Sequence, residues 1–265
     1  MSIRPVKRLV KSTPTLEGAG VRLRRAFGFG ETGDFDPFLL LDDFRGDRPD
    51  DYLAGFPWHP HRGIETITYV LAGNVDHGDS LGNAGTIGPG DVQWMTAGSG
   101  IVHQEMPHGN DRGQMHGFQL WANLPASLKM TAPKYRDVKA ADIPEVTDDD
   151  GTAVKIISGS FWGRRGPVQD VAAEPQAVKT DVVGGADDPG GRYADNRSLV
   201  VFDSGDEVTV QAGERGIRFL LASGAPLGEP IAWRGPIVMN TNEELRQAFE
   251  EFRNGTFLKH EGRRG

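Results

Sequence analysis

Short apolar stretches, each closed by glycine or another turn residue, recur along residues 21–125 and constrain the fold more than any other feature. They read VRLRRAFG, PFLLLDDF, ETITYVLAG, GDVQWMTAG, GIVHQEM and HGFQLWANL. Repeated strands of this length, separated by turn residues, are typical of a β-sandwich or β-barrel. The 36 glycines and 17 prolines agree with this, because they favour tight turns over long helices. The sequence therefore predicts an all-β protein.

A second region repeats this pattern after the acidic segment at residues 137–151, which we interpret as a surface connection. The region contains TAVKIISGSFWG, SLVVFDSGDEVTVQAG and IRFLLASG, and it lacks paired histidines. A chain of 265 residues exceeds the usual size of one domain. We therefore expect two β-domains, at residues 1–140 and 150–265, with a glycine-rich loop near residues 182–197 of the second.

One clear helical pattern lies near the C-terminus, in TNEELRQAFEEFRNG. Thr241 as N-cap and Glu244 three residues later form a capping box. The apolar face of this helix consists of Leu245, Ala248, Phe249 and Phe252. We expect a short C-terminal helix whose apolar face packs on a sheet, although a helix that binds a partner protein has the same pattern.

Composition excludes several classes of function. The chain has no cysteine, so any metal must be bound by histidine, aspartate or glutamate. A formal net charge of −8 argues against nonspecific binding to nucleic acid or to an anionic membrane. The N-terminus lacks the apolar region of a signal peptide, and no run of about 18 apolar residues occurs. We therefore expect a cytoplasmic protein.

Two alternating pairs of polar residues stand out, one in WHPHRGIET and one in GIVHQEM. Alternate residues of a strand share a face, so His59 and His61 point the same way, and so do His103 and Glu105. Glu65 is a further carboxylate close to the first pair. The chain between the pairs is long enough for hairpins to bring them together. Ordinary surface pairs on a polar strand face would show the same spacing.

Three neutral imidazoles and one carboxylate suit a divalent transition metal such as iron, copper, nickel or zinc. An octahedral ion with these four ligands keeps two open positions, as a site needs for a substrate beside dioxygen.

The other histidines lie outside this spacing. We expect His77 and His108 to be exposed, because their segments are rich in turn residues, and His116 to be a hydrogen-bonded core residue. We expect core positions for the tryptophans Trp58, Trp94 and Trp121.

Longer motifs extend the two pairs. They are HPHRGIET at residues 59–66, PGDVQWMTAGSGIVHQEMP at 89–107, HGFQLWANLP at 116–125 and PLGEPIAWRGPIVMNT at 226–241, with DPFLLLDDF at 36–44. Together they resemble the pirin family of the cupin superfamily over most of the chain. The resemblance implies a bicupin, with two cupin-type β-barrels (double-stranded β-helices, or jelly rolls), of which only the N-terminal one binds metal. Around residues 170–200 the second domain is shorter than the family pattern, so we expect a truncated C-terminal barrel.

The resemblance also implies ligands and an activity. The family's metal motif corresponds to His59, His61, His103 and Glu105, which leaves Glu65 as a supporting residue. The implied cofactor is one divalent metal, iron(II) first, with Cu, Ni, Zn, Mn and Co as alternatives. The implied reaction is that of quercetin 2,3-dioxygenase (flavonol 2,4-dioxygenase, quercetinase), with a flavonol and O2 as partners and Glu105 as general base.

Two other functions remain open at this point. One is a non-enzymatic, iron-dependent redox sensor or regulator that binds a protein partner. The other is a barrel in which the metal only stabilises the fold.

Overall fold

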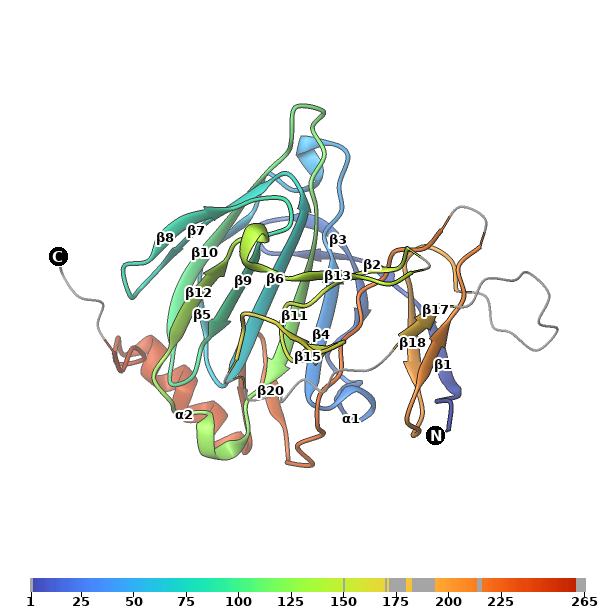
Figure 1. Ribbon diagram of the computed structural model, residues 1–265. Coiled ribbons are helices and arrows are strands. Elements are labelled where there is room, and N and C mark those ends of the chain that lie inside the picture. Colours follow the sequence, from blue (N-terminus) through green and yellow to red (C-terminus); the bar gives the residue numbers. More distant parts are fainter. Residues whose placement is uncertain are drawn as a thin grey trace. The chain divides into compact units, whose positions relative to one another are not determined.

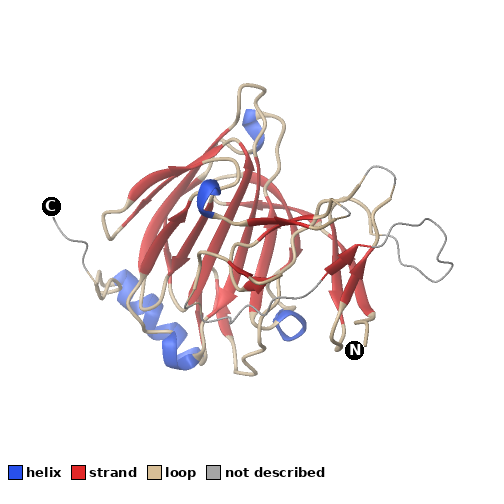
Figure 2. Ribbon diagram, in the orientation of Figure 1, coloured by secondary structure: helices blue, strands red, loops and turns tan. Residues whose placement is uncertain are grey.

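The computed structural model describes residues 2–149, 151–169, 171, 180–182, 194–213 and 216–260. Within these residues, strands account for most of the regular structure (Figure 2), which confirms the all-β class. The chain forms two compact units, each assembled from segments distant in sequence. The large unit comprises Thr13–Ala140 and Pro226–Gly265, and the small unit comprises Met1–Ser12 and Ala141–Ala225.

The large unit contains two extended antiparallel sheets, besides a two-stranded hairpin near its C-terminus. One consists of β2 (Thr13–Glu17), β3 (Val21–Phe27), β4 (Phe38–Asp43), β6 (Ile64–Ala72), β9 (Val92–Thr96), β11 (His116–Asn123) and β12 (Lys134–Val138). The other consists of β5 (Phe56–His61), β7 (Asn74–Asp79), β8 (Ala84–Ile87) and β10 (Ile101–His108). The orders are β12-β9-β6-β11-β4-β3-β2 and β5-β10-β7-β8 (Figure 1). All six strands predicted within residues 21–125 are therefore confirmed.

The two sheets of the large unit share one apolar core. Val21 and Val70 come from the seven-stranded sheet and Val75 and Ile87 from the four-stranded sheet, and all belong to a single buried cluster. Along β10, inward residues alternate with half-buried ones, as a strand of a barrel or sandwich requires. This alternation turns His103 and Glu105 to the inside, as predicted.

Short helical elements connect these strands. They are α1 (Thr32–Phe35) and the 3-10 turns η1 (Pro49–Asp51), η2 (Ala126–Leu128) and η3 (Ala140–Asp142).

The C-terminal part of the large unit is the hairpin of β20 (Ala232–Arg234) and β21 (Ile237–Met239), followed by α2 (Asn242–Arg253). The capping box is confirmed, because the Thr241 hydroxyl accepts from the Glu244 amide while the Glu244 carboxylate accepts from the Thr241 amide. The helix begins where the sequence predicts.

The apolar face of α2 is narrower than predicted. Leu245 and Ala248 are buried in a cluster with Ile237, Met239 and other residues of the large unit. Phe252, in contrast, is 44% exposed. The helix thus packs on the hairpin through its first two turns and leaves part of the last turn in solvent.

The described part of the small unit contains pairs of strands. They are β1 (Val6–Lys11) with β18 (Ser198–Phe202), β13 (Glu145–Thr147) with β14 (Ala153–Lys155), β15 (Ser160–Phe161) with β16 (Arg164–Arg165), and β17 (Thr180–Val182) with β19 (Val208–Val210). The predicted surface connection at residues 137–151 therefore carries a short strand, β13. The expected domain division at residues 140–150 remains a prediction.

The predicted strand IRFLLASG, at residues 217–224, has no regular structure. Ile217 is 41% and Phe219 47% exposed. A strand forms only where another strand pairs its amides and carbonyls, and the sequence does not show whether one is present. Most of the predicted loop at 182–197, and with it the expected truncation near 170–200, lies outside the described residues.

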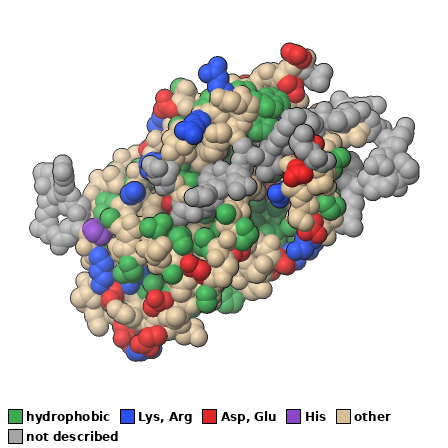
Figure 3. Space-filling model, turned by 60° about the horizontal axis from the view of Figure 1, so that its bottom comes forward, with side chains coloured by type: hydrophobic (Ala, Val, Ile, Leu, Met, Phe, Trp, Pro, Cys, Tyr) green, Lys and Arg blue, Asp and Glu red, His purple; other side chains and the backbone are tan. Residues whose placement is uncertain are grey.

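The surface shown in Figure 3 carries acidic and basic side chains interspersed with apolar ones. Among the described helices, none combines the length and the apolar character needed to cross a bilayer.

Candidate metal centre

Three histidines converge inside the large unit. His59 and His61 lie on β5, and His103 lies on the neighbouring β10, directly opposite His59. The ring centroids are 4.4 Å apart for His59 and His103 and 4.9 Å apart for His61 and His103. One ligand nitrogen from each ring lies within 4.8 Å of the others, the only such group of three or more potential ligands among the described residues. The predicted convergence of the three imidazoles is therefore present in the structure.

Backbone carbonyls determine which nitrogen of two rings carries the proton. His59 Nδ1 is 2.8 Å from the carbonyl oxygen of Pro57, and His61 Nδ1 is 3.2 Å from that of Pro236. A carbonyl oxygen only accepts hydrogen bonds, so each Nδ1 is the donor. In the neutral rings, each Nε2 then carries a lone pair.

The two Nε2 atoms face each other at 3.0 Å. Two lone pairs at this distance repel unless a cation lies between or beside them. Two nitrogens that are each about 2.1 Å from one ion, at a right angle, are about 3.0 Å apart. The spacing therefore fits two ligands of a single metal ion.

Burial favours the neutral, metal-binding form of His61 and His103. His61 is 2% exposed and His103 is fully buried. Burial lowers the pKa of both imidazoles well below the usual value of 6.5, and the neighbouring imidazoles lower it further. Neither ring nitrogen of His103 has a hydrogen-bond partner among the described residues. Buried polar atoms seldom lack a partner, so the donor set fits a divalent cation.

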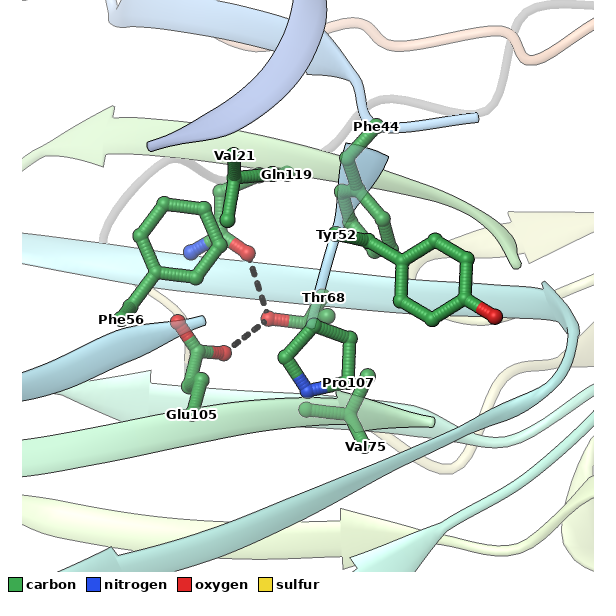
Figure 4. Close-up of a pocket in the computed structure, with 9 residues that line it drawn as sticks. All are labelled: Val21, Phe44, Tyr52, Phe56, Thr68, Val75, Glu105, Pro107 and Gln119. Carbon is green, nitrogen blue, oxygen red and sulfur yellow. Dashed lines mark hydrogen bonds between the residues drawn. The ribbon is translucent and has the colours of Figure 1, made fainter. Parts of the chain in front are cut away.

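A β-bulge interrupts the pairing of β5 with β10 between His103 and Glu105. His103 pairs with His59, but Glu105 pairs with Phe56, so β5 has one residue more than β10 over this interval. The Glu105 carboxylate is buried and accepts a 2.9 Å hydrogen bond from Thr68 Oγ1 (Figure 4). It is not part of the group of mutually close ligand atoms. The structure thus brings together three of the four predicted ligands.

Thr68 belongs to a polar chain that sequence reasoning did not find. Its hydroxyl oxygen is 2.9 Å from Glu105 Oε1 and 2.6 Å from Gln119 Oε1. One hydroxyl has one proton, so both contacts are satisfied when the Gln119 amide is turned to donate to Thr68, which donates to Glu105. The three side chains face a small pocket otherwise lined by Val21, Phe44, Tyr52, Phe56, Val75 and Pro107 (Figure 4). No sequence signal distinguishes Thr68 from Thr66, the other threonine of β6.

Glu65, the other candidate carboxylate, lies on β6. It is 2% exposed and accepts a 2.8 Å hydrogen bond from Thr96 Oγ1. It too lies outside the group of close ligand atoms.

His77 is buried, so the prediction that it is exposed was wrong. Its segment contains turn residues, but β7 continues through them because β10 and β8 pair with both of its edges. The His77 ring stacks on Tyr135 at 4.3 Å and lies 5.5 Å from the His103 ring. His77 Nε2 is 3.2 Å from Asp79 Oδ2. The strand therefore places a fourth imidazole beside the three.

The remaining predictions for histidine and tryptophan had mixed outcomes. His108 is exposed, as predicted, and the half-buried His116 accepts a 3.1 Å hydrogen bond from Arg45. Trp94 is buried, but Trp58 is 56% exposed, so its predicted core position was wrong. Trp121, which is half-buried, presents its ring edge-to-face to His61 at 5.1 Å and lies 6.0 Å from Trp233.

Two antiparallel sheets around a shared core, with inward histidines on adjacent strands, define a cupin-type protein with a possible metal site. The profile of the pirin family matches residues 20–122, and that of the pirin C-terminal cupin domain matches residues 177–258. The chain belongs to the pirin family and has its two cupin domains.

Known proteins resemble the chain over nearly its whole length. A pirin-like protein of Caulobacter vibrioides is 47% identical over 280 residues, covering 97% of this chain and 100% of the relative. Human pirin is 40% identical, covering 92% of this chain and 91% of its own. The crystal structure of a quercetin 2,3-dioxygenase from Acinetobacter baumannii superposes with a TM-score of 0.79 at 29% identity, covering 97% of this chain and 99% of that chain.

Proposed function

We propose that this protein is a metal-dependent dioxygenase that cleaves flavonols such as quercetin with O2. The observation that carries the proposal is the 3.0 Å separation between the Nε2 atoms of His59 and His61, next to His103. The ligand set is these three histidines with Glu105, and iron(II) is the first choice of metal. When bound, such an ion supplies a Lewis acid for the substrate oxygen and a binding position for dioxygen. The likeness to a quercetin 2,3-dioxygenase supports this reaction.

Glu105 is the proposed general base. It shares a strand face with His103, and its side chain is buried. In the proposed reaction its side chain turns away from Thr68 toward the imidazoles, where the carboxylate would accept the proton of the flavonol 3-hydroxyl. A positioned general base contributes about 10²–10⁴-fold to a rate. The hydrogen bond from Thr68 would stabilise the Glu105 carboxylate while it is turned away from the imidazoles.

Aromatic rings next to the histidines favour a flat, apolar substrate. Trp121 contacts His61, and Trp233 contacts Trp121. Rings of this kind bind aromatic ligands through stacked or edge-to-face contacts.

Aerobic turnover of quercetin by the iron(II)-loaded protein, compared with His61→Ala, tests the proposal. We expect the variant to lose at least about 100-fold in rate, because His61 would help to hold the ion that binds the substrate oxygen and orients the reactants. Equal rates in the two proteins would show that the metal takes no part in the reaction. A wild-type protein that holds iron but consumes no flavonol would contradict the dioxygenase and favour a regulatory role.

A second comparison tests the role of the two carboxylates. We expect Glu105→Gln to lower kcat by about 100-fold, as removal of a general base does. Glu65→Gln, which alters a carboxylate bonded to Thr96, is the matched control and should change kcat much less. A larger loss of kcat in Glu65→Gln than in Glu105→Gln would assign the general base to Glu65 and the supporting role to Glu105.

A further inference from the structure

The carbonyl oxygen of Pro236 fixes the ring of His61. Pro236 lies between β20 and β21, 175 residues away from His61 in sequence, and accepts the His61 Nδ1–H at 3.2 Å. The outer hydrogen bond of a metal-binding histidine determines both its tautomer and the direction of its free lone pair. The direction of His61 Nε2 therefore depends on the hairpin of β20 and β21.

Arg62, the next residue, is attached to the same part of the chain. It is 2% exposed, and its guanidinium donates to the carbonyl oxygen of Phe257 at 2.8 Å and pairs with Glu251 of α2 at 2.8 Å. Its Cζ lies 4.2 Å from the centroid of the Phe257 ring. Its own carbonyl accepts from the Val238 amide at 3.1 Å. A buried guanidinium that loses its partners is strongly destabilising, so these contacts hold the backbone next to His61 in place.

Gly63 completes the contact. Its φ is +77°, and a Cβ atom there would lie 1.9 Å from the carbonyl oxygen of Val238. Lys129, 1% exposed, donates its Nζ protons to Gly63 and Val238 carbonyl oxygens, both at 3.0 Å, and to Asn123 Oδ1 at 2.8 Å. Three successive residues, His61 to Gly63, are thus each in direct contact with residues 236–257, which we name the C-terminal brace.

We propose that the C-terminal brace is a positioning element of the histidine site, and that Arg62 is the positioning residue that links the two. The inference rests on the proposed metal site. Because His61 Nδ1 is bound to the brace while its Nε2 faces the site, docking of the brace and binding of the metal stabilise each other. Such coupling is reciprocal, so undocking of the brace would weaken metal binding by the same factor by which bound metal favours docking.

Titration of the metal-free full-length protein with Ni(II) tests this coupling. Nickel binds imidazole nitrogen, and Ni(II) is stable in air. We expect Arg62→Met to weaken Ni(II) binding about 10–100-fold, the usual effect of losing support for a metal ligand. Glu251→Gln should weaken it by a smaller factor. Glu250→Gln is the matched control on the same helix, because Glu250 pairs with the exposed Arg246, and it should bind as the wild type does.

Circular dichroism shows whether each variant is folded. A folded Arg62→Met variant with wild-type affinity for Ni(II) would overturn the proposal. If Arg62→Met does not fold, the Ni(II) affinity of Glu251→Gln tests the proposal instead. Wild-type affinity in that variant would then overturn the proposal. A wild-type protein that binds no Ni(II) would refute the metal site itself, and the inference with it.

Amide hydrogen exchange supplies a readout independent of affinity. Saturation with Ni(II) should slow exchange in α2 of the wild-type protein severalfold, and the slowing should be absent in His61→Ala. Unchanged exchange in α2 of the Ni(II)-saturated wild-type protein would overturn the coupling.

Discussion

The large and small units are both built from strands, but they differ in how far strand pairing extends. In the large unit, sheets of seven and four strands form, whereas the described strands of the small unit occur in pairs. β10 has a paired neighbour on each side and carries both His103 and Glu105. A side chain on such a strand is held from both edges, which suits a site that requires accurate placement of its ligands. Among the described residues, the group of three potential ligands lies in the large unit.

The largest expected effect is the loss of metal from His103→Ala. His103 is a proposed ligand from the central strand, so its removal should reduce Ni(II) affinity by more than about 100-fold. His108→Ala is the matched control, because His108 lies on the same strand but is exposed. Metal analysis of both variants decides. Metal retained by His103→Ala would place the site elsewhere and break the contrast between the units.

Core truncation should distinguish the packing of the two units. Ile101 of the large unit is fully buried, and Ile156 of the small unit is 4% exposed. Substitution of a buried isoleucine by alanine lowers the free energy of unfolding by about 2–5 kcal/mol, and less where neighbours can collapse into the cavity. In urea unfolding, we expect the loss in free energy to lie near the upper end of this range for Ile101→Ala. For Ile156→Ala it should lie near the lower end. Equal losses would show that the small unit is packed as firmly as the large one.

Acid should weaken the attachment of α2 within the large unit. Burial raises the pKa of Glu251, but Lys259 and Arg62 outweigh it and lower this pKa from 4.5 to about 2. A carboxylate with a lowered pKa stabilises the fold above its unfolded pKa, and this contribution is lost as the pH falls from 4.5 toward 2. At pH 7, Glu251→Gln should lower the free energy of unfolding by about 2 kcal/mol.

Urea unfolding at a series of pH values measures the free energy of unfolding of the wild type and of Glu251→Gln. The difference between the two free energies should shrink toward zero in acid. Glu145→Gln is the control from the small unit, since Glu145 and Lys155 are exposed and 4.0 Å apart. A difference for Glu251→Gln that stays constant from pH 7 to 2 would contradict the ion-pair explanation.

The smallest expected effect concerns the first turn of α2. Thr241→Ala removes the N-cap and should lower the free energy of unfolding by about 1 kcal/mol. Thr147→Ala, at an exposed position of β13 in the small unit, should change it by less than about 0.5 kcal/mol. Thermal unfolding of the two variants measures both. A larger loss of stability in Thr147→Ala than in Thr241→Ala would show that the N-cap does not help to stabilise α2.

Much of the large unit could be predicted because its signals are local. Glycine punctuation located the strands, alternation turned His103 and Glu105 inward, and the capping box fixed the start of α2. The hydrogen bond from Thr68 to Glu105 has no sequence signal, so the absence of Glu105 from the group of close ligand atoms was not foreseen.

Long-range contacts were equally hidden from the sequence. The hydrogen bond between His61 and Pro236 joins residues 175 positions apart, and no periodicity reports such a contact. The burial of His77 follows from strands on both sides of β7, which the turn-rich composition of that segment obscures. The unformed strand at residues 217–224 shows the converse, because an apolar stretch alone does not supply a pairing partner.

The edge-to-face contact between Trp121 and His61, at 5.1 Å, has a practical consequence. An indole this close to a paramagnetic ion loses its excited state to the ion, so its emission dims as the ion arrives. Trp121 would therefore report the arrival of a paramagnetic ion at the proposed metal site, and Trp121→Phe would weaken that signal without removing a nitrogen donor from the site.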